Sequence, residues 1–157
     1  MPRVLSNETL EEIEALTRRY PTRLGALLPS LHLAQKKHGY LSPEVQQDIA
    51  EKLDVPPARV TEVVTFYTMF HDEKVGRNVV KLCRNLACQL RGADRLIARA
   101  EQKLGIKCGD TTGDGRVTLE KDECLGSCGT GPMLWWNDEF VENLDEKKLD
   151  DFLAGLK

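Results

Sequence analysis

Residues 78–104 read NVVKLCRNLACQLRGADRLIARAEQKL. The stretch opens with Asn78-Val-Val-Lys-Leu-Cys83, a short β-branched and apolar run that predicts a β-strand. After Gly92, apolar residues recur at helical spacing, and this predicts a helix from about Ala93 to Leu104. A strand followed by a helix is the building unit of a layer of helices packed on a sheet.

The remainder of the second half continues this layer. Glycine and asparagine turns separate short extended segments there, and an amphipathic helix follows them. Together these segments predict a small α/β domain with a mixed sheet over residues 76–157. The expected elements are a turn at Gly113–Gly115, an extended run at Arg116–Glu123, a hairpin of Met133–Trp136 and Phe140–Glu142 around Asn137-Asp138, and a helix at Glu146–Leu156.

The first half has a different pattern, with amphipathic helical segments separated by proline and glycine. Ser42-Pro43, for example, combines a helix cap with a first-turn proline. The expected helices are Thr9–Leu16, Arg23–His38, Pro43–Leu53 and Ala58–Phe70. The sequence therefore predicts an α+β chain of two domains, with a helical bundle over residues 1–75 followed by the α/β domain at 76–157.

Composition limits the classes of protein to which the chain can belong. Its 157 residues carry a formal charge of -3, without the clustered Lys and Arg that nucleic-acid or anionic-membrane binding requires. The longest purely apolar run, Met133–Trp136, is far shorter than the roughly 20 residues of a membrane-spanning helix. The N-terminus is acidic and does not resemble a signal peptide. We expect a soluble cytoplasmic protein with no nucleic-acid partner and no direct membrane insertion.

Five cysteines are an odd number, which does not fit a disulfide framework in a chain without an export signal. Cys83 and Cys88 are separated by four residues, and Cys124 and Cys128 by three. Each pair follows a predicted strand, so we expect both pairs on neighbouring loops at one edge of the sheet. Cys108 stands alone between them and is interpreted as an incidental thiol.

The spacing of the pairs leaves three interpretations open. Structural zinc sites use cysteine pairs with two to four intervening residues, so zinc fits. Gly126, Gly129 and Gly131 crowd the second pair, and glycines let backbone N–H groups approach sulfur, which favours an iron–sulfur cluster. Reduced or disulfide-bonded cysteines are the third interpretation, although neither pair has the spacing of a dithiol redox motif.

Several strings of the sequence are similar to one known family. They include Cys83-Arg-Asn-Leu-Ala-Cys88-Gln-Leu-Arg-Gly92, Glu123-Cys-Leu-Gly-Ser-Cys-Gly-Thr-Gly-Pro132, His38-Gly-Tyr-Leu-Ser42 and Val64-Thr-Phe-Tyr67. Over nearly its whole length the chain resembles the thioredoxin-like 2Fe-2S subunit (E-type, 24 kDa-type) of NADH:quinone oxidoreductase, complex I. The resemblance implies a thioredoxin-like fold for the second half and one 2Fe-2S cluster ligated by Cys83, Cys88, Cys124 and Cys128.

The resemblance also implies a function. In this family the chain is an electron-transfer subunit of the NADH dehydrogenase module, without catalytic residues of its own. Its helical half clamps the flavoprotein subunit, which binds FMN and NADH, and its cluster lies near the FMN. The complex reduces quinone, and its peripheral arm, built with other subunits, is attached to the inner face of the cell membrane.

Two alternatives remain at this point. Related subunits serve as diaphorase components of NAD-linked hydrogenases and formate dehydrogenases, which would keep the cluster and change the complex. A zinc-stabilised interaction module is an alternative of another class.

Overall fold

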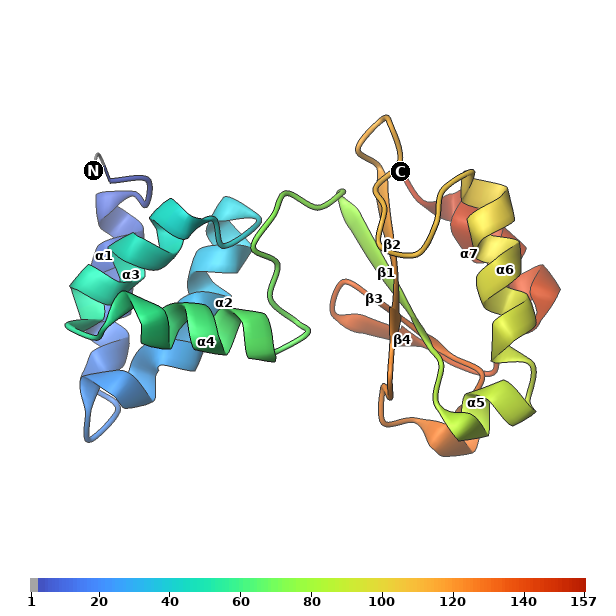
Figure 1. The fold of residues 1–157 in the computed structure, drawn as a ribbon, viewed down its shortest axis with the longest axis horizontal. Helices are drawn as coiled ribbons and strands as arrows, with labels where there is room; N and C mark the ends of the chain where they lie inside the picture. Colours follow the sequence, from blue (N-terminus) through green and yellow to red (C-terminus); the bar gives the residue numbers. More distant parts are fainter. Residues whose placement is uncertain (1–2) are drawn as a thin grey trace. The chain divides into compact units, whose positions relative to one another are not determined.

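The computed structural model describes residues 3–157 and divides the chain into two compact units, with the boundary between Lys74 and Val75 (Figure 1). The first unit contains only helices, and the second contains helices and a four-stranded sheet. The α+β class expected from the sequence is confirmed. Within residues 3–157, no helix is long and apolar enough to cross a membrane.

The first unit consists of short helices whose ends follow the local sequence. Ser6 caps the first helix by accepting a hydrogen bond from Thr9 N, and Ser42 caps the third by accepting one from Val45 N. Gly39 ends the second helix with a φ of 97°, a conformation that favours glycine. The elements are α1 (Asn7–Thr17), η1 (Arg23–Ala26), α2 (Leu27–His38), α3 (Pro43–Leu53) and α4 (Pro57–Phe66).

Two of the expected helices differ in their bounds. The helix expected from Arg23 to His38 begins as a separate 3-10 turn, and α4 ends at Phe66 rather than at Phe70. Tyr67 has extended backbone dihedrals, as the low helix propensity of this β-branched and aromatic stretch allows. The chain then turns so that Phe70 is buried, with its ring 4.9 Å from that of His32.

Buried side chains of the helices form one core in the first unit. Those with no more than 1% of their surface exposed include Ile13, Leu31, Val45, Ile49, Leu53 and Val60.

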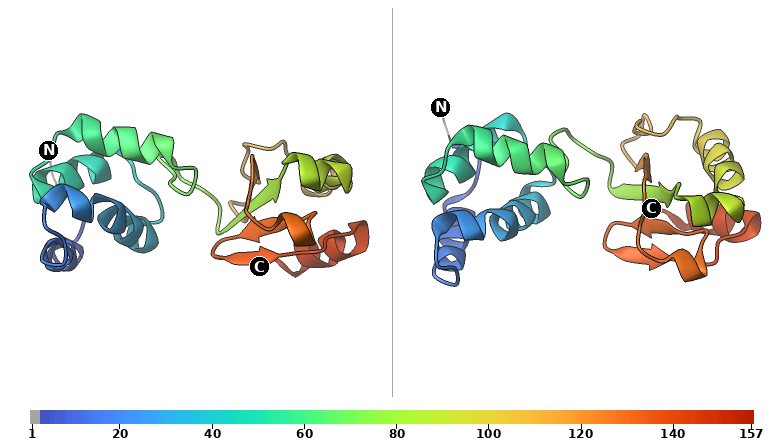
Figure 2. Two further views of the ribbon diagram at one scale, coloured as in Figure 1. Left: turned by 90° about the horizontal axis from the view of Figure 1, so that it is seen from below. Right: turned by 60° about the horizontal axis from the view of Figure 1, so that its bottom comes forward.

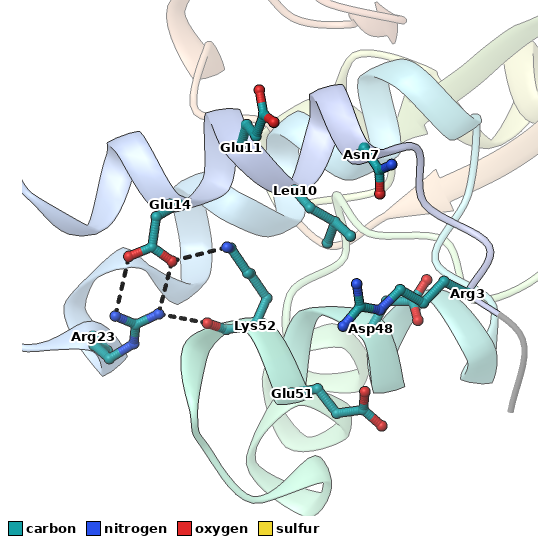
Figure 3. Close-up of a pocket in the computed structure, with 9 residues that line it drawn as sticks. All are labelled: Arg3, Asn7, Leu10, Glu11, Glu14, Arg23, Asp48, Glu51 and Lys52. Carbon is teal, nitrogen blue, oxygen red and sulfur yellow. Dashed lines mark hydrogen bonds and ion pairs between the residues drawn. The ribbon is translucent and has the colours of Figure 1, made fainter.

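Charged side chains line a surface pocket of this unit (Figure 3), where Glu14 of α1 lies between Arg23 and Lys52. Glu14 Oε2 is 3.0 Å from both Arg23 Nη2 and Lys52 Nζ, so one carboxylate connects α1 to η1 and α3.

The second unit is built on a mixed sheet with the strand order β2-β1-β3-β4. β1 and β2 are parallel, whereas β1–β3 and β3–β4 are antiparallel, so the mixed sheet expected from the sequence is confirmed. The elements are β1 (Asn78–Cys83), α5 (Leu86–Leu90), α6 (Ala93–Leu104), β2 (Val117–Asp122), η2 (Cys128–Thr130), β3 (Leu134–Trp136), β4 (Glu139–Val141) and α7 (Glu146–Gly155). The short helix α5 was not expected from the sequence pattern.

Helices α6 and α7 lie against one face of this sheet (Figure 1). Alternation along β1 and β2 directs every second side chain into the core between sheet and helices. This core contains Val80, Leu82, Leu96, Val117, Leu119, Leu134, Leu149 and Leu153. Arg99 of α6 joins the two helices, because its guanidinium donates to Asp150 at 2.7 and 2.8 Å and to Glu146 at 3.0 Å.

The β3–β4 hairpin forms one side of the sheet (Figure 2), and its turn contains Asn137 with a φ of 51°. The two adjacent tryptophans of β3 have different surroundings, as alternation predicts. Trp136 packs on the core, with its Nε1 donating to Asn78 Oδ1 at 3.0 Å and its ring 5.6 Å from that of Phe152. Trp135 instead has its ring centroid 5.6 Å from Lys81 Nζ.

We predict that replacement of Glu14 by Gln removes a pH-dependent part of the stability. Hydrogen bonds from Arg23 and Lys52 lower the pKa of the Glu14 carboxyl from 4.5 to about 2. A carboxyl with a lowered folded-state pKa stabilises the protein above its unfolded pKa, and this contribution is lost as the pH falls from about 4.5 towards about 2. Urea unfolding of wild-type and Glu14→Gln protein, followed by helical circular dichroism, should therefore give different free energies at neutral pH. The difference should shrink at about pH 3.

Glu11→Gln is the matched control for this measurement. Glu11 lies on the same helix and lines the same pocket (Figure 3), but within residues 3–157 it forms no ion pair. A Glu14→Gln effect that is equally large at neutral and acidic pH would contradict the assignment.

Candidate metal centre

Four of the cysteines lie at one end of the sheet. Cys83 is the last residue of β1 and Cys88 lies in α5, whereas Cys124 follows the end of β2 and Cys128 begins η2. Cys83 pairs in register with Asp122, so the parallel strands β1 and β2 end at the same edge. The expectation that both pairs lie at one edge of the sheet is confirmed.

The first pair does not lie on a loop, contrary to the expectation from the sequence. Cys83 is still within the strand, and Cys88 is held by the short helix α5. In the structure, Gln89 N donates to Asn85 O at 2.9 Å and closes the first turn of this helix. The sequence contains only the four-residue spacing of Leu86 and Leu90, and five residues are too few to give a recognisable period.

Neighbouring thiols within each pair raise the pKa values of the cysteines. Burial raises the pKa of Cys88 to about 11, with a further contribution from the neighbouring Cys83 thiol. The neighbouring Cys124 thiol likewise raises the pKa of Cys128. Crowded thiols of this kind lose their protons most readily when a cation binds the resulting thiolates and compensates their charge.

Backbone groups also approach these sulfurs. Gly126 N donates to Cys124 Sγ at 3.4 Å. Gly131 comes so close to Cys88 that a Cβ at this position would lie 2.8 Å from the sulfur. Amide N–H groups directed at sulfur stabilise thiolates and electron-rich iron–sulfur centres.

The donor set fits a binuclear cluster. All five cysteines are free, and across the described part of the chain no group of three or more His, Cys, Asp or Glu side chains is arranged to hold a metal ion. A 2Fe-2S cluster takes four thiolates, and the two cysteine pairs at this end of the sheet offer four sulfurs. The pairs also lie near each other, because the charge of Cys128 contributes to the raised pKa of Cys88, and the charge of Cys83 to that of Cys128.

The two pairs differ in their exposure to solvent. Cys83 and Cys88 are 2% and 1% exposed and pack with Ala93 and Met133, whereas Cys124 and Cys128 are exposed. A centre held by all four would therefore be covered by protein on one side and open on the other.

Cys108 lies apart from this group. It packs against the core of the second unit, and its backbone N donates to Glu101 Oε1 at 3.1 Å. Burial raises the pKa of its thiol. Cys108 is therefore a partly buried residue that packs against the core of the second unit.

The family model described as thioredoxin-like [2Fe-2S] ferredoxin matches residues 13–157 of this sequence. The chain belongs to that family. The family resemblance inferred from the sequence motifs is thereby confirmed.

Relatives in this family are similar over most of the chain. The NADH-quinone oxidoreductase E-subunit 2 of Rhizobium meliloti is 44% identical over 147 residues, which cover 94% of this chain and 88% of the relative. The NADH-quinone oxidoreductase E-subunit of Rickettsia conorii is 36% identical, with 96% and 92% covered. The mitochondrial NADH dehydrogenase [ubiquinone] flavoprotein 2 of Dictyostelium discoideum is 37% identical over 97% of this chain, which spans 63% of that protein.

A solved structure shares the fold. The NAD+-reducing [NiFe]-hydrogenase in its H2-reduced state superposes with a TM-score of 0.74 at 21% identity, over 86% of this chain. This chain spans 22% of the hydrogenase chain. At this identity the likeness establishes the fold alone.

We predict that the two cysteine pairs of the metal-free protein react at different rates with a thiol reagent. Iodoacetamide at about pH 8 should modify Cys124 and Cys128 first, because they are exposed and Cys83 and Cys88 are buried. The Cys88 rate should rise with pH towards its pKa of about 11, since only the thiolate reacts. Mass spectrometry of peptides after timed quenching measures these rates. Equal modification of all four cysteines would contradict the described packing.

Proposed function

We propose that this chain is the electron-transfer subunit of an NADH:quinone oxidoreductase and carries one 2Fe-2S cluster on Cys83, Cys88, Cys124 and Cys128. The observation that carries the proposal is that two cysteine pairs lie at the same end of the sheet in a chain of the thioredoxin-like [2Fe-2S] family. The relatives named as E-subunits of NADH-quinone oxidoreductase support the choice of complex.

The chain's own residues suit the cluster in three ways. Cys83 and Cys88 hold one side on a strand and a helix, where their positions are fixed by packing. The backbone N–H of Gly126 donates to the sulfur of Cys124 and so stabilises negative charge there. When bound, the cluster supplies a one-electron carrier. The open side at Cys124 and Cys128 leaves an approach for an electron-exchange partner.

The partner in this proposal is the flavoprotein subunit, which binds FMN and NADH. The helical unit at residues 1–75 docks on that protein, while the domain at 76–157 places its cluster near the flavin. Exposed apolar side chains on the helical unit support a docking role: Phe66 is 75% exposed and Leu24 48%. Such a chain belongs to the cytoplasmic peripheral arm of a complex attached to the inner face of the cell membrane.

The second candidate is the equivalent diaphorase subunit of an NAD-linked hydrogenase. The fold likeness to the NAD+-reducing [NiFe]-hydrogenase is the observation in its favour. Co-purification of the tagged chain from its native cell decides between the two. Recovery with a flavoprotein and quinone-site subunits supports the first candidate, and recovery with a hydrogenase large subunit supports the second.

We predict that anaerobically purified protein is brown and contains about two iron and two sulfide ions per chain. On reduction it should give an EPR signal, because the reduced cluster has an unpaired electron. A colourless protein with one zinc ion would instead identify a zinc-stabilised interaction module and overturn the proposal.

We predict that Cys124→Ser loses or strongly destabilises the cluster, whereas Cys108→Ser keeps its full iron content. Cys124 is a proposed ligand, and Cys108 packs in the core away from the four. Iron and sulfide analysis with visible absorption measures both variants, and Cys108→Ser is the matched control. If Cys108→Ser bleaches the protein, the ligand set is wrong.

A further inference from the structure

A carboxylate outside the cysteine set holds the loop that carries Cys128. Glu142 directly follows β4, and its Oε1 accepts a hydrogen bond from Thr130 Oγ1 at 2.6 Å and another from Ser127 Oγ. The two hydroxyl oxygens are themselves 2.6 Å apart. We call these three side chains, Ser127, Thr130 and Glu142, the loop brace.

Main-chain hydrogen bonds fix the two segments that the loop brace joins. Asn143 N donates to Thr130 O at 2.7 Å, and Leu144 N donates to Pro132 O at 2.8 Å. Leu144 is buried in the core of the second unit, and Lys148 Nζ donates to Glu142 O. Glu142 is therefore anchored to the folded core and can hold a neighbouring segment in place.

Outside the loop brace, one side chain holds the segment between the two hydroxyls: Arg91 Nη1 donates to Gly129 O at 3.1 Å. Ser127 and Thr130 enclose Cys128 in sequence, and η2 is only three residues long. Gly126 and Gly129 flank the same turn, and a Cβ at either would meet no atom within 4 Å. Cys83, in contrast, is fixed in a central strand. The position of the exposed Cys128 thus depends on hydrogen bonds, those of the loop brace and the one from Arg91, more than on packing.

We propose that Glu142 is a positioning residue that holds Cys128 in the conformation needed to ligate the cluster. The inference rests on the proposed function only in taking Cys128 as a ligand. Glu142 acts through Ser127 and Thr130, since both hydroxyls donate to one of its oxygens. Loss of an outer hydrogen-bonding partner typically weakens a metal site by about 10- to 100-fold.

Substitutions of Glu142 separate the effect of its hydrogen-bonding position from the effect of its negative charge. Gln at residue 142 keeps an acceptor oxygen at the same reach but removes the charge, whereas Asp keeps the charge on a side chain one methylene shorter. If the loop brace acts by position, Glu142→Gln preserves the cluster better than Glu142→Asp does, and Glu142→Ala is the worst. If the charge alone mattered, the order of Gln and Asp would be reversed.

The experiment uses full-length protein with its cluster, purified anaerobically and exposed to an iron chelator. The visible absorbance of Glu142→Ala should decay about tenfold or more faster than that of wild type. Its reduced EPR spectrum should change, and Glu142→Gln should restore the wild-type line shape, which a loss of general stability would not explain. Thr130→Val should reproduce part of the effect and add little to Glu142→Ala, because both remove the same contact.

Glu139→Ala is the control, since this residue is exposed and lies on β4, the short strand that Glu142 directly follows. Wild-type protein that binds no iron would overturn the proposed function. Wild-type protein with a cluster, together with a Glu142→Ala variant that bleaches at the wild-type rate, would overturn only the positioning role. Should Glu142→Ala fail to fold, the order of Glu142→Gln, Glu142→Asp and Thr130→Val decides the question.

Discussion

The parallel pairing of β1 with β2 is the constraint on which the rest of the second unit depends. Because Cys83 is in register with Asp122, the residues that follow each strand emerge at the same edge of the sheet. Parallel strands need a crossover, which α6 supplies, and burial of α6 against the sheet fixes the register. Cysteines far apart in the sequence are thereby brought to one end of the sheet. Their segments are also joined directly, by hydrogen bonds from Arg84 N to Asp122 O at 2.9 Å and from Arg91 Nη1 to Gly129 O at 3.1 Å.

The two halves of the candidate site use different means to fix their cysteines. One half is fixed by secondary structure and burial, with Cys83 in a strand and Cys88 in a helix. The other half is a glycine-rich turn held by hydrogen bonds, from Gly126 N to Cys124 Sγ and from the hydroxyls of Ser127 and Thr130 to Glu142. Packing thus fixes one cysteine pair, and hydrogen bonds fix the other.

Local patterns were sufficient to predict most elements of the fold and the shared edge of the cysteine pairs. β1 and α6 have the predicted bounds, because a β-branched run and a long apolar period are strong signals. Helix α5 was missed because it is too short to show a period, and α4 was extended too far because Phe70 continues the apolar spacing although the backbone leaves the helix at Tyr67. The loop brace could not be predicted, since its contacts span 12 and 15 residues and follow no periodic pattern.

The unequal burial of the cysteines has a consequence for how the centre is assembled. Cys83 and Cys88 are covered by Ala93 and Met133 once the sheet and helices are in place. For the proposed cluster, iron and sulfide delivered to the folded chain would therefore enter from the side of Cys124 and Cys128. The proposed redox partner would approach the same side, so loading of the centre and docking of that partner would compete for one surface.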